Sequence, residues 1–260
     1  MVSDVAIGKG ADIASKRQAT LLFLYVKSTK TAGSINSLLQ GRRWEDALIL
    51  LRSLLENLIC YRWLKMNGDA AVVRFARFEC VAKLSEHIKS REATIFKRDP
   101  EEFDYLAAQA EIEQELMRLN EMLKSLEPTF DLEKQKDLDS KGLWAGQSVR
   151  QMAEEIDKSN STRDLTWTYD IPFAVGSEFV HPNPAVIWSY LRITNGRMIP
   201  LFKATEGWGH EIDVLACHTL FEMARFANED FQLGKSKLVQ QLRSDLERLG
   251  RREVRKQHRF

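Results

Sequence analysis

The sequence predicts an all-α protein: a multi-helix bundle with a long protruding helical hairpin arm and a basic C-terminal helical tail. Three observations predict this class. Apolar residues recur at three- and four-residue spacing over most of the 260 residues. Glycine and proline are few, at 13 and six, and mostly avoid these stretches. No stretch shows the apolar–polar alternation of a half-buried strand.

The helices follow in order from these patterns and from their stop signals. Gly41 ends the first helix, Asn67-Gly68-Asp69 predicts a stop and a new start, Pro128 ends the fourth helix, and Gly234 closes the last core helix. The predicted helices are 12–40, 44–66, 70–96, 99–126, about 145–158, about 163–180, a short turn around 184–192, 205–232 and the tail at 235–258.

Two charge asymmetries divide the chain into a bundle domain at 1–233 and a basic tail at 234–260. The arm at 99–139 holds 13 acids against four bases, and the tail holds nine bases against three acids. The part of the arm at 129–141 is charged and poor in apolar residues, which predicts a mobile connection. Both charged regions have a plain interpretation as solvated helical faces that attract each other.

The arm and the tail each have a sharper interpretation. Five apolar residues step by four and three along the arm, as in a coiled coil, and predict a homo-oligomer or a partner protein docked on 99–126: Ile112, Leu116, Leu119, Leu123 and Leu126. The tail has a leucine face expected to dock on the core, formed by Leu238, Leu242, Leu246 and Leu249. Five cations are the predicted contacts to RNA or DNA phosphates: Arg251, Arg252, Arg255, Lys256 and Arg259.

Composition and missing motifs exclude several classes of protein. A formal net charge of +1 excludes a globally basic nucleic-acid binder. Three scattered cysteines form no disulfide framework, and no signal-peptide pattern or membrane span is recognisable, so a cytoplasmic protein away from membranes is expected. No phosphate-binding loop, dinucleotide fingerprint or nucleophile elbow occurs, and Glu178-x-x-His181 lacks a second copy for a di-metal site. We therefore expect no metal and no cofactor.

Arg52 and Glu56 are the first candidate functional residues. They lie four apart on one face of the second helix, among the apolar neighbours Leu48, Ile49, Leu55, Ile59, Cys60 and Trp63. Charges in an apolar surface need partners, because removing them from water is costly. The pair predicts either a structural ion pair that fixes helix packing or a polar pocket between helices.

A second candidate cluster lies at the end of the helix near 163–180. Ser177 and His181 share a helix face at four apart, and a histidine beside a hydroxyl is suited to general acid–base chemistry near neutral pH. The alternative is that His181 caps the helix C-terminus, where a cation is favourable, and that Pro182 enforces the stop.

These residues resemble an uncharacterised bacterial all-helical family. The segment Arg52 to Glu56 is similar to its R-x-x-x-E motif, and the segment Trp144–Val149 with Met152-Ala153 is similar to a second motif. An aromatic-rich helix starting at Tyr169 ends in S-x-x-x-H at Ser177 and His181. The resemblance spans about residues 45–230.

This family is similar in outline to the higher-eukaryote-and-prokaryote nucleotide-binding (HEPN-like) helical domains, many of which are RNA-cleaving toxins or antiviral defence effectors. Those domains carry R-x(4–6)-H on one late helix, whereas no arginine precedes His181 at that spacing here. An RNA-cleaving function would therefore require Arg52 to supply the missing cation from another helix.

Two functions follow as hypotheses. In the first, the chain cleaves RNA without metal: His181 acts as general acid or base, Arg52 stabilises the phosphorane charge, Glu56 orients Arg52, and Ser177 holds the substrate or His181. In the second, the chain is a non-catalytic interaction or ligand-binding module, and the same Arg/Glu/His cluster is structural.

Overall fold

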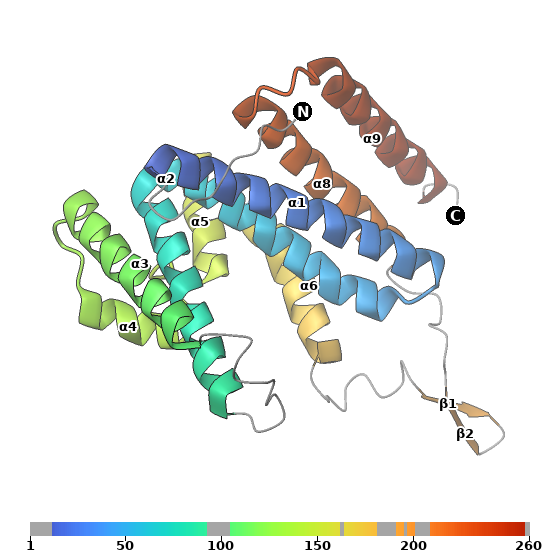
Figure 1. Ribbon diagram of the computed structural model, residues 1–260. Helices are drawn as coiled ribbons and strands as arrows, with labels where there is room; N and C mark the ends of the chain where they lie inside the picture. Colours follow the sequence, from blue (N-terminus) through green and yellow to red (C-terminus); the bar gives the residue numbers. More distant parts are fainter. Residues whose placement is uncertain are drawn as a thin grey trace. The chain divides into compact units, whose positions relative to one another are not determined.

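The computed structural model describes residues 12–92, 105–161, 164–180, 191–194, 197–200 and 209–257 (Figure 1). Eight α-helices account for nearly all of these residues, which confirms the all-α prediction. The elements are α1 (Ile13–Gln40), α2 (Trp44–Glu92), α3 (Tyr105–Leu126), α4 (Leu132–Ser140), α5 (Val149–Ser159), α6 (Asp164–Val180), β1 (Leu191–Thr194), β2 (Arg197–Pro200), α8 (Gly209–Asp230) and α9 (Ser236–Gln257).

The chain divides into two compact units, each made of two separate stretches of sequence. Unit 1 comprises residues 1–20 and 63–151, and unit 2 comprises residues 21–62 and 152–260. The boundary between 233 and 234 that the charge pattern indicates stays a prediction.

A helical hairpin opens unit 2. Residues 41–43 reverse the chain between α1 and α2, with Arg42 in the left-handed conformation at φ 56°. The apolar stripes of the two helices are buried, at Leu21, Leu24, Ile35, Leu51, Leu54, Leu55 and Ile59. This burial confirms that the most apolar stretch of the sequence is a core helix. None of the described helices is long and apolar enough to cross a bilayer.

The predicted break at Asn67-Gly68-Asp69 is a kink inside one long helix. Gly68 alone leaves helical geometry, at φ 67° and ψ −146°, in a region that residues with a side chain hardly occupy. Two helical segments therefore meet at Gly68 within α2, at the position where the sequence predicts one helix to stop and the next to start.

The leucine seam of the arm packs inside unit 1. Leu119 and Leu123 of α3 are fully buried and contact Val73 of α2. Leu126, at the end of the same seam, stays exposed. The chain itself thus covers two of the five seam residues, and docking of a partner on 99–126 stays a prediction.

The connection predicted as mobile at 129–141 instead contains helix α4. Asp131 caps its N-terminus, accepting hydrogen bonds from the backbone N–H groups of Glu133 and Lys134. Gln135 and Asp139 are buried although the helix is almost entirely polar. Hydrogen bonding within unit 1, and not an apolar face, orders this segment.

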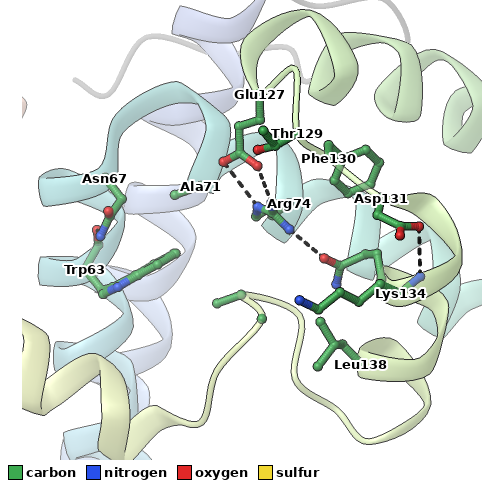
Figure 2. Close-up of a pocket in the computed structure, with 13 residues that line it drawn as sticks. Trp63, Asn67, Ala71, Arg74, Glu127, Thr129, Phe130, Asp131, Lys134 and Leu138 are labelled. Atoms are coloured by element: carbon green, nitrogen blue, oxygen red, sulfur yellow. Dashed lines mark hydrogen bonds and ion pairs between the residues drawn. The ribbon is translucent and has the colours of Figure 1, made fainter.

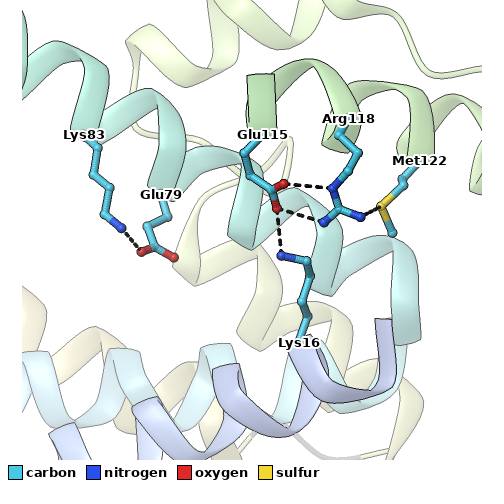
Figure 3. Close-up of polar contacts among 6 residues, drawn as sticks. All are labelled: Lys16, Glu79, Lys83, Glu115, Arg118 and Met122. Carbon is cyan, nitrogen blue, oxygen red and sulfur yellow. Dashed lines mark hydrogen bonds and ion pairs between the residues drawn. The ribbon is translucent and has the colours of Figure 1, made fainter. Parts of the chain in front are cut away.

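A three-residue charge cluster ties the start of α1 to α3 in unit 1 (Figure 3). The Lys16 ammonium donates to Oε1 of Glu115 at 2.8 Å, and the Arg118 guanidinium donates to both oxygens of the same carboxylate. The Arg118 and Lys16 hydrogen bonds lower the pKa of Glu115 to about 2, against the opposing effect of burial.

A carboxylate from the preceding helix caps the N-terminus of helix α6 in unit 2. The backbone N–H groups of Leu165 and Thr166 donate to the two oxygens of Asp157 on α5, at 3.2 and 2.8 Å. Asp157 is buried and satisfies donors that a helix N-terminus leaves open. This contact fixes the start of the helix that carries Tyr169, Phe173 and Ser177.

Strands β1 and β2 form an antiparallel pair that the periodicity analysis did not predict. Leu191 and Arg192 were expected in a short turn of helix, and they belong to β1 instead. Ile193 pairs with Met198, and both side chains are exposed. With only four residues in each strand, the alternation is too short to stand out from its neighbours.

Helices α8 and α9 pack against each other in unit 2 (Figure 1). Gly234, which the sequence predicts to close the last core helix, lies at φ 65° in the connection between them, four residues after α8 ends at Asp230. The predicted docking of the leucine face is wrong for two of its members, since Leu238 and Leu242 of α9 are 52% and 41% exposed. Helix α9 contacts the core through α8 with only part of its leucine face.

Candidate functional site

Arg52 and Glu56 form the ion pair that their spacing predicts. The Arg52 Nε donates to Oε1 of Glu56 at 3.0 Å, one turn apart on α2 in unit 2. Each side chain is 29% exposed. The pair is therefore half-buried, at the edge of the apolar surface and within reach of solvent.

Helix α6 adds two aromatic residues to this pair. The Tyr169 hydroxyl donates to Oε1 of Glu56 at 3.3 Å, and the Phe173 ring centroid lies 4.1 Å from Cζ of Arg52. The order of contacts, Arg52 on Phe173 and Glu56 on Tyr169, shows that the two helices run antiparallel here. We call these four residues the Arg52 cluster.

The electrostatics of the Arg52 cluster keep Tyr169 protonated. Burial and the negative charge of Glu56 raise the pKa of Tyr169 far above neutrality, so its hydroxyl remains a donor. Next to the cluster, burial raises the pKa of Cys60 to about 12, so that its thiol is no nucleophile at neutral pH. The charged groups available for chemistry here are Arg52 and Glu56.

The other two predicted catalytic residues are placed only in part. Ser177 belongs to α6, two turns beyond Tyr169 and about 12 Å along the helix axis at 1.5 Å per residue. Its side chain and the whole of His181 lie outside the described residues. The structure thus brings together Arg52 and Glu56, and it adds Tyr169 and Phe173.

The spacing of those two aromatic residues is the signal that sequence analysis missed. Tyr169 and Phe173 are four apart, the same interval as Arg52 and Glu56, so the two pairs match turn for turn on antiparallel helices. The aromatic-rich character of this helix is visible in the sequence. The contact of Tyr169 with Glu56, 113 positions earlier, cannot be recognised from the sequence.

The predicted nucleic-acid contacts fall at the end of α9. Arg251, Arg252, Arg255 and Lys256 lie within the helix, but their side chains and all of Arg259 are outside the described residues. The described part of α9 holds arginines in intrahelical pairs, Arg243 with Glu247 and Arg248 with Asp245. The phosphate-binding role of the tail therefore stays a prediction.

A buried polar network that the sequence did not reveal fills the centre of unit 1. The Arg77 guanidinium pairs with Asp139, and the two side chains are only 3% and 5% exposed. The Arg77 Nε also donates to Oδ1 of Asn120 at 2.6 Å. The Gln135 amide donates to Oδ1 of Asp139 at 3.0 Å and to the backbone carbonyl of Trp144 at 3.3 Å.

A pocket of about 320 Å³ lies above this network in unit 1 (Figure 2). Arg74 joins the two, since its Nη1 donates to Oε1 of Gln135 at 2.5 Å and its Nε and Nη2 pair with Glu127. The Phe130 ring centroid lies 5.3 Å from the guanidinium carbon. Trp63 and Asn67 of α2 and Lys134 of α4 also line the pocket.

Comparisons with known proteins give a family without an assigned activity. Comparison with the curated proteins and with the solved structures each gave no match. In the described part of the chain, no group of three His, Cys, Asp or Glu side chains is placed to hold a metal ion. One family model matches residues 18–198, well over half of the chain, including the Arg52 cluster and the pocket of unit 1. The chain thus belongs to the family of unknown function DUF5677.

Proposed function

We propose that this chain binds and cleaves RNA without a metal ion, as a defence- or toxin-like protein, and that Arg52 is the cation of the cleavage site. The observation that supports this is the Arg52 cluster. A guanidinium is held by a carboxylate and an aromatic ring, yet 29% of its side chain meets solvent. A fixed and accessible arginine suits the stabilisation of charge on a phosphate.

The proposed chemistry is attack of a ribose 2′-hydroxyl on the adjacent phosphorus. A base removes the hydroxyl proton as the new P–O bond forms, and an acid protonates the departing 5′-oxygen as the old bond breaks. The products are a 2′,3′-cyclic phosphate and a free 5′-hydroxyl. We assign acid or base to His181, phosphorane stabilisation to Arg52, orientation of Arg52 to Glu56, and substrate contact to Ser177.

Exposed aromatic residues on α6 support RNA as the substrate. Trp167 is 68% exposed and Phe173 is 39% exposed on the helix that faces Arg52. Unpaired bases of RNA stack on such side chains. In this proposal the cations at the end of α9 add affinity for the phosphate backbone.

The decisive experiment compares two arginine variants of unit 2 for RNA degradation in the presence of a chelator. Arg52→Met removes the proposed cation. Arg225→Met is the matched control, because Arg225 also pairs with a carboxylate at i+4, Glu229, and lies 4.2 Å from the ring of Phe226. We expect Arg52→Met to lower the cleavage rate about 100-fold or more, the usual effect of losing one charge-stabilising donor, and Arg225→Met to leave it near wild type.

The same assay contains the outcomes that reject the proposal. His181→Ala should abolish cleavage. The products of the wild-type protein should carry cyclic phosphate ends. Wild-type protein that leaves single-stranded RNA intact, or equal rates for Arg52→Met and wild type, would overturn the cleavage function.

The salt dependence of RNA binding tests whether the tail binds phosphates. Deleting 250–260 should weaken binding to all sequences and flatten the log–log slope by about 0.7–0.9 for each lost phosphate contact. An unchanged slope would reject the phosphate-binding role of Arg251, Arg252, Arg255, Lys256 and Arg259.

The second candidate function is a non-catalytic helical interaction or ligand-binding module. The observation in its favour is that Tyr169 and Phe173 engage Glu56 and Arg52 within the chain, as a structural clamp between α2 and α6 would. This alternative predicts intact RNA together with a lower melting temperature for Arg52→Met.

A further inference from the structure

We propose that helix α9 binds the α9 of a second copy of this chain in an antiparallel pair, through the apolar edge formed by Leu238 and Leu242. This self-association goes beyond the proposed RNA cleavage and does not depend on it. The contact lies in unit 2, on the N-terminal half of α9, a helix that packs on α8 of its own copy (Figure 1).

The apolar face of α9 is only partly used within the chain. Leu238 and Leu242 lie along one edge of this face, about 40° apart around the helix axis. Val239 and Leu246 lie along the other edge and are partly buried, as expected on the side that packs on α8. Leu238 and Leu242 are 52% and 41% exposed. Two leucines one turn apart in contact with water favour a partner that covers them.

The charges beside this edge match those of a second copy. Lys237, Gln241 and Asp245 follow one another at four-residue intervals on the flank of α9 next to the two leucines. Lys237 has no ion-pair partner among the described residues. The Asp245 side chain is 46% exposed and pairs with Arg248 on the same flank. The flank thus carries an available cation at one end and an accessible carboxylate two turns later.

An antiparallel pair with its two-fold axis at about Gln241 uses the leucines and the charges together. Leu238 of each copy then lies opposite the partner's Leu242. Lys237 of each copy lies opposite the partner's Asp245, so that opposite charges meet at both ends of the contact. Such an interface is isologous, because one surface patch contacts itself across the axis. This reciprocal match is the reason to assign the edge to a second copy.

Charge also selects the antiparallel orientation. A parallel pair in register would place each Lys237 opposite the partner's Lys237 and would bring the two cationic ends of α9 together. The tail at 234–260 carries nine bases against three acids, so the two ends repel each other. The antiparallel pair instead directs them away from one another.

The apolar contact is tested by sedimentation equilibrium of the full chain at micromolar to millimolar concentrations. Two short helical segments bury less than the roughly 1,200–2,000 Å² of stable complexes, so we expect a dimer that depends on concentration. Leu242→Asp should weaken it at least about tenfold, because a carboxylate enters the apolar contact. Leu126→Asp is the matched control and should leave the dimer unchanged, since Leu126 is 39% exposed on α3 of unit 1. Circular dichroism checks that both variants fold.

A charge exchange tests the antiparallel register. Lys237→Asp places two carboxylates opposite each other, and Asp245→Lys places two ammonium groups opposite each other. Each single variant should weaken the dimer about fivefold or more at low salt. The double variant Lys237→Asp/Asp245→Lys brings opposite charges together again and should recover the affinity of the wild type.

Several results would overturn the proposal. One is a full chain that stays monomeric up to millimolar concentration. Monomeric protein that sediments with phosphatidylglycerol vesicles, and no longer does so as Leu242→Asp, would assign the edge to an anionic membrane surface instead. A dimer that Leu126→Asp disrupts and Leu242→Asp does not would place the contact on the arm. A double charge variant as weak as the two single variants combined would reject the antiparallel pair.

Discussion

Two arginine–carboxylate pairs, one in each unit, show how burial decides what such a pair does. Arg52 and Glu56 are one helical turn apart and 29% exposed, so part of their surroundings is solvent. Arg77 and Asp139 are 62 positions apart, almost completely buried, and satisfied by Asn120 and Gln135. The first pair can be recognised from the sequence and is reachable by solvent. The second is hidden in the sequence and unreachable, and it holds α4 in place.

The largest effect is expected from breaking the buried pair. Arg77→Met leaves the Asp139 carboxylate buried without its counter-charge and should lower the free energy of unfolding by about 3–5 kcal/mol. Urea denaturation followed by circular dichroism measures this. The double variant Arg77→Met/Asp139→Leu should recover much of the loss, though not all, because Asn120 and Gln135 each lose a partner. If Arg77→Met is as stable as wild type, the buried pair does not stabilise the fold more than the partly exposed pair does.

An intermediate effect is expected from the Glu115 carboxylate, which is 20% exposed and lies between the two pairs in burial. Its pKa is depressed from 4.5 to about 2 in the folded chain, so its stabilisation is complete above pH 4.5 and is lost as the pH falls toward 2. The loss is at most about 3.5 kcal/mol, since one pKa unit corresponds to about 1.4 kcal/mol.

Unfolding free energies at pH 2 to 6 test this contribution. Glu115→Gln should flatten the acid side of the profile relative to wild type. Glu121→Gln, exposed on the same helix, is the control and should keep the wild-type slope. Profiles of equal slope for the two variants would contradict a special role for the carboxylate shared by Lys16 and Arg118.

The smallest effect on stability is expected from the partly exposed pair, Arg52 and Glu56. Arg52→Met or Glu56→Leu should cost about 1 kcal/mol or less, because exposed ion pairs at i and i+4 contribute little. The double variant should be close to the sum of the singles. Thermal melts of all three check this, and a loss of 3 kcal/mol in either single variant would show that the Arg52 cluster is structural like its buried counterpart.

The sequence predicts the helices and the Arg52–Glu56 pair because both depend on residues close in the chain. The start of α1 and the end of α6 agree with the predicted bounds within a residue. Helix α4 could not be predicted in this way. Gln135 and Asp139 look like solvated polar residues until Arg77, about 60 positions earlier, is placed beside them.

Other misses had a signal in the sequence. Asn195-Gly196 between two short apolar stretches is a strong hairpin indicator, and it stands between β1 and β2. The break at Gly68, by contrast, is predicted at the correct position, and only the absence of a loop between the two helical segments is not evident from the sequence. The contact of Tyr169 with Glu56 depends on tertiary packing alone.

The interleaving of the two units has a consequence for the order in which the chain acquires its structure during synthesis. Every segment of unit 1 has been synthesised once residue 151 is made, whereas unit 2 needs residues up to 260. Tyr61 illustrates the delay, because its hydroxyl donates to Asp230 at 2.7 Å, 169 positions later. At 5–20 residues per second, that partner emerges roughly 10–30 seconds after Tyr61 itself. For that interval the apolar stripe of 21–62 has no α8 to cover it, and the nascent chain is then most exposed to aggregation and to capture by chaperones.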